Sequence, residues 1–206
     1  MNEFDIKAAE WDKSAMHRER AETIAAEIIK QIPLNQGMTA MEFGAGTGLL
    51  SFKLKDHLRE ITLIDNSEGM VKVLNEKLMT AKTANMKVIR ADLEHEDIAA
   101  GPFDLIYTLM VLHHVGDIAT IIKKFHDLLN PGGFLAIADL YSEDGSFHGD
   151  GFHGHRGFDP LSLAALLEKQ GFAGLSHRKV FAIDKSVSDN SIKKFEVFLI
   201  TAIKPA

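Results

Sequence analysis

A glycine-rich turn follows the first predicted strand of this chain and could hold a ligand. The segment Glu42–Gly48, with the sequence EFGAGTG, carries glycine at three alternate positions just before a predicted helix. Glycine lets the backbone bend sharply, and a ligand can then lie against bare main chain beside the N–H groups of a helix start. A tight turn without a ligand is the alternative. Three glycines exceed what such a turn needs, so we favour a ligand site.

An acidic residue, Asp65, ends the second predicted strand. A carboxylate at this place can accept hydrogen bonds from both hydroxyls of a ribose, which implies a ligand that contains adenosine. A lone acid at a strand end is usually a solvated loop residue. Its spacing from the glycine turn is what favours the ribose role.

The glycine turn departs from the dinucleotide-binding fingerprint. That fingerprint needs Gly or Ala at the position where this chain has Leu49. Glu42 would also lie close to a pyrophosphate, whereas it suits a ligand that has an ammonium group and no phosphate. NAD therefore fits this turn poorly.

Short apolar runs alternate with helical patterns and must position these residues. Strands are expected over 39–43, 61–64, 86–89, 103–110 and 134–140, and helices over 16–32, 48–58, 67–79 and 117–129. This alternation indicates a parallel sheet with helices on both faces. A further helix should begin at Asp159-Pro160 and end near Gly171. Two strands, 174–183 and 195–203, should then pair as an antiparallel hairpin at the edge of the sheet.

The composition limits the class of protein and its partners. The chain has 206 residues, a formal net charge of −6 and no cysteine. It lacks the basic surface of nucleic-acid binders, and its longest apolar run, about 105–112, is too short to span a bilayer. The lack of cysteine removes disulfides and thiolate metal sites. We expect a cytoplasmic monomer or homodimer with no nucleic-acid or membrane partner.

Five blocks of sequence extend the pattern of the glycine turn over almost the whole chain. The blocks are Glu42–Gly48, Asp65–Met70, Ala91–Leu93, Phe103–His114 and Leu129–Gly133. In this order they resemble the class I S-adenosylmethionine-dependent methyltransferases, in particular the small branch with the ubiquinone and menaquinone C-methyltransferases. The resemblance implies an α/β fold, a Rossmann-like three-layer sandwich. Its seven-stranded sheet would be mostly parallel, with an antiparallel C-terminal strand.

The domain organisation follows from these patterns and from the resemblance. We expect one methyltransferase domain over 1–206, with N-terminal cap helices in 1–36 and a cofactor-binding core in 37–140. A flap on the substrate side should occupy 141–158, because a long loop in a compact domain is usually functional or disordered. The helix and the terminal hairpin make up 159–206.

The resemblance also implies which residues hold the methionyl part of S-adenosylmethionine. Those near the methionyl group and the sulfonium methyl would be Gly44, Ala45, Gly46, Thr108 and Leu109. Glu42 would hold the amino group, directly or through water. Trp11, in a segment that closes over the cofactor in similar enzymes, would add apolar cover; a purely structural anchor is the alternative.

The adenosine part would be held by the next two blocks. By resemblance, Asp65 would bind the ribose, and Asn66 beside it belongs to the same cofactor site. Met70 would pack on the adenine, while Asp92 and Leu93 would recognise its edge.

Histidines follow the fourth predicted strand, where the family often has a pair. His113 and His114 are therefore the catalytic candidates, as a polar contact or a general base, since histidine can accept a proton near neutral pH. The alternative is a loop histidine that is bonded to the backbone.

A second group of histidines lies in the glycine-rich loop and invites comparison with a metal site. His148, His153 and His155 occur there with Asp150 and Asp159, and imidazole and carboxylate are plausible ligands. The loop lacks the fixed helical spacing of established two-histidine metal motifs. We therefore expect no metal.

The sequence thus predicts transfer of a methyl group from S-adenosylmethionine to a small-molecule acceptor, with S-adenosylhomocysteine as the product. The protein would align the acceptor for in-line displacement and exclude water. Two alternatives stay open. One is a non-catalytic S-adenosylmethionine-binding regulatory module, which would bind the cofactor without turnover. The other is a nucleotide-dependent oxidoreductase of related fold, which would prefer NAD(H).

Overall fold

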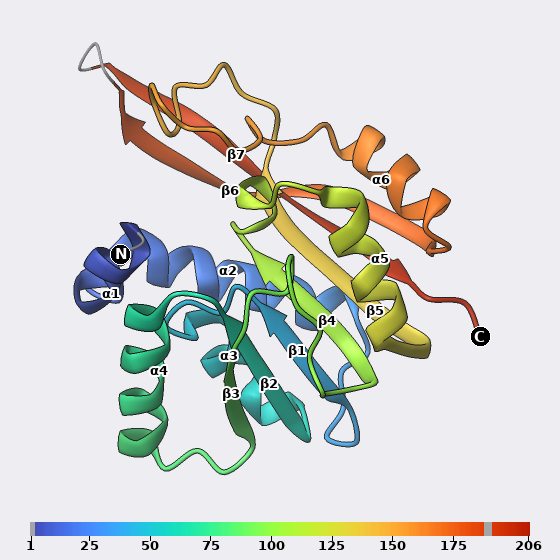
Figure 1. Cartoon of the computed structure of the whole chain (residues 1–206). Helices are drawn as coiled ribbons and strands as arrows, with labels where there is room; N and C mark the ends of the chain where they lie inside the picture. The colour runs from blue at the N-terminus through green and yellow to red at the C-terminus, as the bar shows by residue number, and fades with distance from the viewer. Residues whose placement is uncertain (1–2, 188–190) are drawn as a thin grey trace.

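A seven-stranded sheet forms the centre of the computed structural model, which describes residues 3–187 and 191–206. The strand order is β3-β2-β1-β4-β5-β7-β6 (Figure 1). The strands are β1 (Thr39–Phe43), β2 (Glu60–Asp65), β3 (Met86–Arg90), β4 (Phe103–Leu109), β5 (Leu129–Leu140), β6 (Ala173–Ser186) and β7 (Ile192–Ile203). All seven were predicted, and β1 has the predicted bounds.

The pairing makes the sheet mixed, as the sequence predicted. Strand β1 pairs parallel with β2 and β4, and these pair parallel with β3 and β5. Strand β7 is antiparallel to both β5 and β6. In this register Glu42 lies between Leu63 and Tyr107 on the neighbouring strands. The fold class predicted from the sequence is therefore confirmed.

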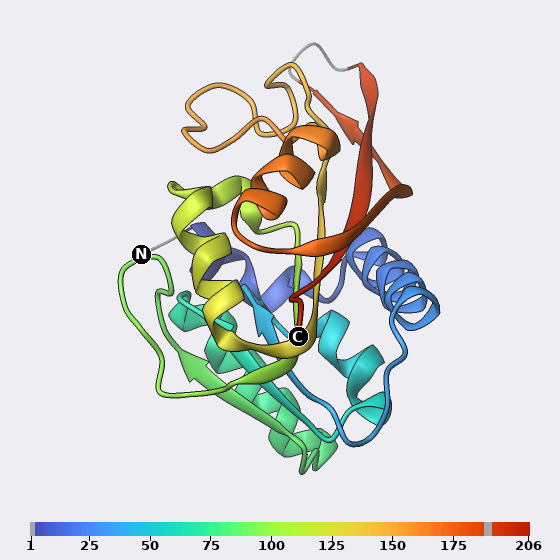
Figure 2. The same cartoon turned by 90° about the vertical axis from the view of Figure 1, so that its right-hand side faces the viewer.

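Helices cover both faces of the sheet and complete the three layers (Figure 2). The helices are α1 (Glu3–Trp11), α2 (Ala15–Gln31), α3 (Leu49–Leu54), α4 (Glu68–Ala81), α5 (Ile118–Leu128) and α6 (Pro160–Lys169), with short 3₁₀ turns η1 (Lys55–His57) and η2 (Leu112–His114). One apolar core joins the sheet to α2, α3 and α4, and a second joins its other face to α5 and α6. No helix among these residues is long and apolar enough to cross a membrane.

Polar caps explain where several helices begin. The side chains of Ser14, Ser67, Asp117 and Asp159 each accept a hydrogen bond from a backbone N–H in the first turn of the helix that follows. Such caps satisfy N–H groups that have no partner within the helix. Pro160 then occupies the first turn of α6, as predicted.

The N-terminal helix α1 lies across the start of α4 and beside the glycine turn. Asp5 accepts hydrogen bonds from the Oγ of Ser67 at 2.7 Å and from the backbone N of Gly69 at 3.0 Å. Just after α1, Asp12 pairs with the Nζ of Lys77 at 2.6 Å. These contacts hold the start of the chain over the carboxyl ends of the central strands.

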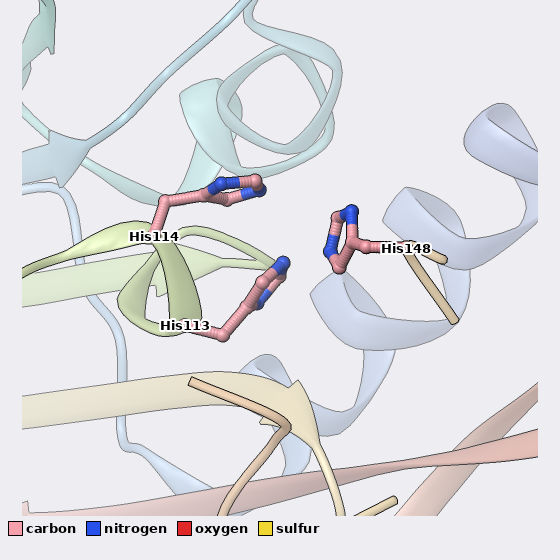
Figure 3. A group of neighbouring side chains, drawn as sticks. All are labelled: His113, His114 and His148. Carbon is pink, nitrogen blue, oxygen red and sulfur yellow. The ribbon is translucent and has the colours of Figure 1, made fainter. Parts of the chain in front are cut away.

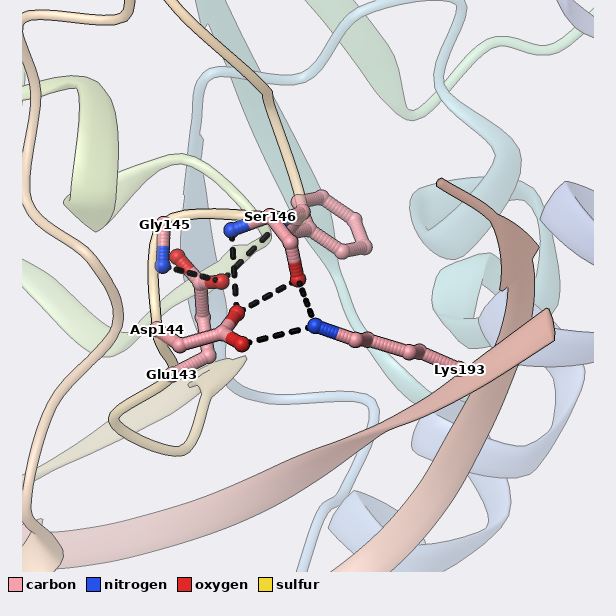
Figure 4. Close-up of polar contacts among 6 residues, drawn as sticks. Glu143, Asp144, Gly145, Ser146 and Lys193 are labelled. Atoms are coloured by element: carbon pink, nitrogen blue, oxygen red, sulfur yellow. Dashed lines mark hydrogen bonds and ion pairs between the residues drawn. The ribbon is translucent and has the colours of Figure 1, made fainter. Parts of the chain in front are cut away.

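The segment 141–158, named the flap, has no regular helix or strand inside it. Its two ends meet, because the backbone N of Ser142 donates to the carbonyl of Phe158 at 2.9 Å. Figure 4 shows how its first turn is tied to β7: the Nζ of Lys193 lies 2.7 Å from Asp144 and 3.2 Å from the Oγ of Ser146. The flap and the hairpin therefore form one connected wall.

Candidate functional site

A cavity of about 730 Å³ opens at the carboxyl ends of the parallel strands. This is the edge of an open α/β sheet where ligands bind. Helices α1 and α2, the segments that follow β1 to β4, the flap and β6 all contribute to its walls. The predicted residues in its lining are Trp11, Glu42, Gly44, Ala45, Gly46, Asp65, Asn66, Met70, Asp92, Leu93, Leu109, His113 and His114.

The three glycines of the turn serve different purposes. A Cβ built on Gly44 would lie 2.4 Å from Cγ2 of Val111, and one on Gly48 would lie 2.7 Å from Cδ1 of Leu74. Both residues also have positive φ, 67° and 77°, so the backbone conformation together with the packing favours glycine at these two positions. At Gly46 the nearest atom to a Cβ would be the Sδ of Met70 at 3.9 Å. Gly46 thus presents bare backbone to the cavity.

Asp65 ties the glycine turn to the end of β2. Its Oδ2 accepts a hydrogen bond from the backbone N of Gly46 at 2.7 Å, and its Oδ1 accepts one from the N of Ser67 at 2.8 Å. Burial raises the pKa of Asp65, and these two N–H donors oppose that rise. Each carboxylate oxygen has a second lone pair, so Asp65 can accept further hydrogen bonds from a ligand.

Glu42 lies deeper, at the end of β1, with only 2% of its surface exposed. It accepts a hydrogen bond from the Oγ of Ser51, which also contacts the hydroxyl of Tyr107. Burial raises the pKa of Glu42 to about 8, because the hydroxyl of Ser51 only partly replaces water. A cationic ligand group would stabilise the ionised form.

The predicted adenine contacts gather on one side of the cavity. Met70 and Leu93 are buried, and they offer apolar surface. The Oδ1 of Asp92 accepts a weak hydrogen bond from the N of Glu94 at 3.2 Å, so it keeps acceptor capacity. Asn66 is exposed at the rim.

At the end of β4 the structure separates two neighbouring residues that the resemblance had grouped. Leu109 lines the cavity, whereas Thr108 does not. The side chain of Thr108 is buried, and its Oγ1 donates to the carbonyl of Phe43 at 2.8 Å. Successive side chains of a strand point to opposite faces, so only one of the two can face the cavity. The structure does not bring Thr108 into the site.

Trp11 forms part of the wall that α1 contributes. Its ring packs on His17 with a centroid distance of 4.1 Å and meets Phe4 edge to face at 6.1 Å. The Nδ1 of His17 lies 3.0 Å from the carbonyl oxygen of Trp11. This placement agrees with apolar cover over a ligand.

His113 and His114 line the cavity together with His148 of the flap (Figure 3). His113 is buried, and its Nδ1 lies 2.5 Å from the Oδ1 of Asp139 at the end of β5. Burial lowers the pKa of His114 and of His148 to about 4, and the neighbouring His113 adds to the effect. The sequence grouped His148 with His153 and His155 instead, and neither of these lines the cavity.

Arg20 and Lys185 are among the lining residues that the sequence did not predict. Arg20 of α2 has only 6% of its surface exposed, and no hydrogen bond joins its Nε to the residues that the structure describes. Burial lowers its pKa to about 10. The signal was its place four residues before Ile24, on the apolar stripe of the helix. Lys185 comes from β6, and nothing in its local sequence marks it.

Comparison with known proteins places the chain in a family. Residues 16–177 match a family model described as a methyltransferase domain. An uncharacterized methyltransferase from Schizosaccharomyces pombe is 31% identical over 160 residues, which cover 70% of this chain and 55% of that relative. The chain therefore spans little more than half of this relative.

Solved structures with low sequence identity share the fold. One is a chain of the complex between the Haloferax volcanii Trm112 methyltransferase activator and a methyltransferase, with a TM-score of 0.77, 17% identity and coverage of 100% of this chain and 99% of that one. Another is the N-methyltransferase NodS from Bradyrhizobium japonicum in complex with S-adenosylhomocysteine, with a TM-score of 0.70, 18% identity and coverage of 96% and 91%. The chain thus belongs to the methyltransferase domain family and has the class I S-adenosylmethionine-dependent methyltransferase fold that its five sequence blocks predicted.

Proposed function

We propose that this chain binds S-adenosylmethionine and transfers the methyl group to a small-molecule acceptor, with S-adenosylhomocysteine as the product. One observation carries the proposal: the bare backbone of Gly46 and the carboxylates of Asp65 and Glu42 line a single cavity. Membership of the methyltransferase domain family supports the same cofactor.

The adenosine half of the cofactor fits the part of the cavity next to Asp65. The carboxylate accepts hydrogen bonds from the ribose, and the backbone N–H donors of Gly46 and Ser67 keep it oriented. The apolar surfaces of Met70 and Leu93 suit the faces of an adenine ring.

The methionyl half fits between the glycine turn and Glu42. Glu42 holds the ammonium group, and this charge offsets the cost of a buried carboxylate. Trp11 covers this part of the cavity, and Leu109 lies near the reacting methyl. S-adenosylmethionine, when bound, supplies a methyl group that its sulfonium already activates.

The acceptor occupies the part of the cavity between His113 and the hairpin in this proposal. Helix α1, the flap and β6 all border it, and its walls include Arg20, Phe147 and Lys185. A chamber enclosed by three chain segments suits a small molecule and excludes water from the reacting atoms. His113 and His114 contact the acceptor, and their predicted role as proton acceptors applies only where the acceptor loses a proton.

Calorimetric titration of S-adenosylhomocysteine tests the cofactor site. Gly46→Val should abolish binding, because its side chain would occupy the space of the ligand. Gly132→Val is the matched control: Gly46 and Gly132 both have positive φ, 53° and 79°, and neither has an atom close to a built Cβ. Only Gly46 lines the cavity. Equal affinity of the two folded variants would refute the site.

Turnover is tested by release of S-adenosylhomocysteine across a panel of small hydroxyl, amine and thiol acceptors. The proposal expects release with at least one class. Cofactor binding without release for any acceptor would favour the non-catalytic module instead. Preference for NADH over S-adenosylmethionine would favour the oxidoreductase.

A further inference from the structure

Three histidine rings converge at one end of the cavity, although they come from two separate parts of the chain. His113 and His114 belong to η2, and His148 belongs to the flap (Figure 3). One nitrogen of each ring can be chosen so that all three lie within 4.8 Å of one another. Nitrogen ligands of a tetrahedral metal ion lie roughly 3.3 Å apart, as the usual metal–nitrogen distance of about 2.0–2.1 Å requires. The side chains would have to rotate to bring the three nitrogens from within 4.8 Å to that spacing.

The orientation of the His113 ring is fixed by a buried carboxylate. The Nδ1 of His113 contacts the Oδ1 of Asp139, which leaves the Nε2 as the ring nitrogen available to an ion. Asp139 is itself held by the backbone N of His113 at 3.2 Å and of Leu140 at 2.7 Å. A carboxylate that orients a histidine in this way is the usual outer partner of a metal-binding histidine.

His148 supplies a second, independent observation. Its Nε2 is buried and forms no hydrogen bond with any of the described residues. A buried polar nitrogen without a partner is costly and calls for an explanation. A metal ion in the space between the rings would satisfy it.

Aromatic contacts and backbone hydrogen bonds hold the rings in place. The ring of Phe152 stacks on His148 with a centroid distance of 3.9 Å and meets the edge of His114 at 5.3 Å. The flap is also bound to η2, because the N of His155 donates to the carbonyl of His113 at 2.7 Å. The convergence therefore follows from the packing of the flap and is not a chance approach of exposed side chains.

We propose that His113, His114 and His148 bind a divalent transition-metal ion, with Zn²⁺ as the expected ion. Three imidazoles without a thiolate suit Zn²⁺ and its neighbours in the first row, whereas Mg²⁺ and Ca²⁺ prefer oxygen ligands. The carboxylates of Asp139 and Glu3 act on these rings and would favour a cation there, whereas the cations Lys7, Arg20 and Lys185 of the cavity lining would oppose it.

Three protein ligands would leave one tetrahedral position open, and all three histidines line the cavity. Sites of this kind keep the open position for water or substrate. An acceptor with an oxygen or nitrogen donor would fill it; this part of the inference rests on the proposed function. Binding of the ion itself does not depend on methyl transfer.

Metal titration of the chelator-stripped full chain tests the site. Zn²⁺ should bind with a stoichiometry of one by calorimetry, Co²⁺ should give the visible absorption of a four-coordinate ion, and Mg²⁺ should not compete. His148→Ala should weaken Zn²⁺ binding at least about tenfold, whereas His153→Ala, an exposed histidine of the same flap, should leave it unchanged. Asp139→Asn should weaken it by about ten- to a hundredfold.

The outcomes separate this inference from the proposed function. If the stripped chain binds no Zn²⁺, or if His148→Ala and His153→Ala bind it equally, the metal site is refuted. His114→Gln provides a second variant should His148→Ala fail to fold. The stripped wild-type chain is titrated with S-adenosylhomocysteine in parallel. If the chain binds the nucleoside but fails to bind Zn²⁺, only the metal site is refuted. If it binds Zn²⁺ but fails to bind the nucleoside, only the cofactor site is refuted.

Discussion

The buried carboxylate of Glu42 and the partly buried carboxylate of Asp65 face the same cavity but differ in their hydrogen-bond donors. Asp65 accepts hydrogen bonds from the backbone N–H groups of two residues, whereas Glu42 is stabilised by Ser51, through its hydroxyl and its backbone N–H. The backbone donors belong to a fixed turn, so Asp65 is prepared to act as an anion without a ligand. Glu42 gains most from a ligand cation, because burial is the largest cause of the rise of its pKa to about 8.

Replacement of Asp65 tests the recognition of adenosine. Asp65→Ala should weaken binding of S-adenosylhomocysteine about ten- to a hundredfold, because a charge-assisted hydrogen bond contributes roughly 1.5–3 kcal/mol. Asp65→Asn keeps one acceptor oxygen and should lose less, although its NH₂ group then faces one of the two backbone N–H donors. Calorimetry measures both affinities. Wild-type affinity in a folded Asp65→Ala variant would mean that the residue is only a structural part of the turn.

Replacement of Glu42 tests the effect of pH. Its pKa is raised from 4.5 to about 8, so between these values the folded protein keeps a proton that the unfolded chain releases. Stability from this group is therefore full below pH 4.5 and falls as the pH rises toward 8. Glu42→Gln should remove this fall, so the variant should gain stability relative to wild type as the pH increases.

Urea unfolding at several pH values between 4.5 and 8.5 measures the difference. Groups that face Glu42 are Tyr107, Asp65 and Lys77, and all are unchanged in the variant. Glu168→Gln, at an exposed position of α6, is the control and should follow wild type. A constant difference between Glu42→Gln and wild type across the pH range would contradict the prediction.

Residue types and spacing predicted most of the candidate site, but not all of it. The sequence placed the glycine turn, Asp65 and the histidine pair at the ends of predicted strands. Parallel strands bring these ends to one edge of the sheet, so the order of elements predicts that the residues lie near one another. Thr108 was expected in the cofactor site but does not line the cavity, because a motif does not say which of two adjacent side chains faces it. The sequence also could not predict that His148 lies beside His113, since this depends on how the irregular flap folds back over the cavity.

Helix α1 forms part of the wall of a site whose floor comes from the ends of the core strands. A Cβ on Gly69, at the start of α4, would lie 2.7 Å from both the Cα and the carbonyl oxygen of Asp5. The backbone of α1 therefore rests directly on a glycine of α4. The fit depends on main chain, so no flexible side chain can move aside.

Gly69→Ala is expected to displace α1 from α4. Alanine favours a helix interior over glycine by up to about 1 kcal/mol, so helix propensity alone would raise stability. The close contact predicts the opposite: faster amide exchange over 3–11 and weaker binding of S-adenosylhomocysteine. Gly116→Ala is the control, because its Cβ would meet nothing nearer than 3.7 Å. Increased stability of Gly69→Ala with unchanged exchange in α1 would refute this packing.

The strands of the hairpin exceed their predicted lengths for a clear physical reason. Strands β6 and β7 extend to Ser186 and Ile192, whereas the sequence predicted a polar connection over 184–194. Beyond the sheet the two strands form a ribbon with much of its surface exposed, so its residues are polar and resemble a loop (Figure 1). Apolar and polar residues alternate along a strand when one of its faces is buried, and this part of the hairpin is little buried.

At the scale of the whole molecule, the cavity is closed by segments that lie far apart in the sequence. The core strands supply its floor, while α1, the flap and β6 supply its walls. The sequence could predict the floor from local patterns, because parallel strands bring their carboxyl ends together. It could not predict the volume or the lining of the acceptor part, which depends on how three distant segments meet.

The single domain predicted for 1–206 can be tested with the only tryptophan of the chain, Trp11, which lies in α1 at the cavity wall. If α1 unfolds together with the sheet, thermal unfolding followed by Trp11 fluorescence and by far-UV circular dichroism should have one midpoint. S-adenosylhomocysteine at a hundred times its Kd should stabilise the folded state by roughly 2.7 kcal/mol and raise both midpoints by roughly 5–11 °C. Asp65→Ala should reduce that shift at the same ligand concentration. An earlier Trp11 transition that the ligand does not move would show that α1 is a separate unit which neither shares the core nor covers the cofactor.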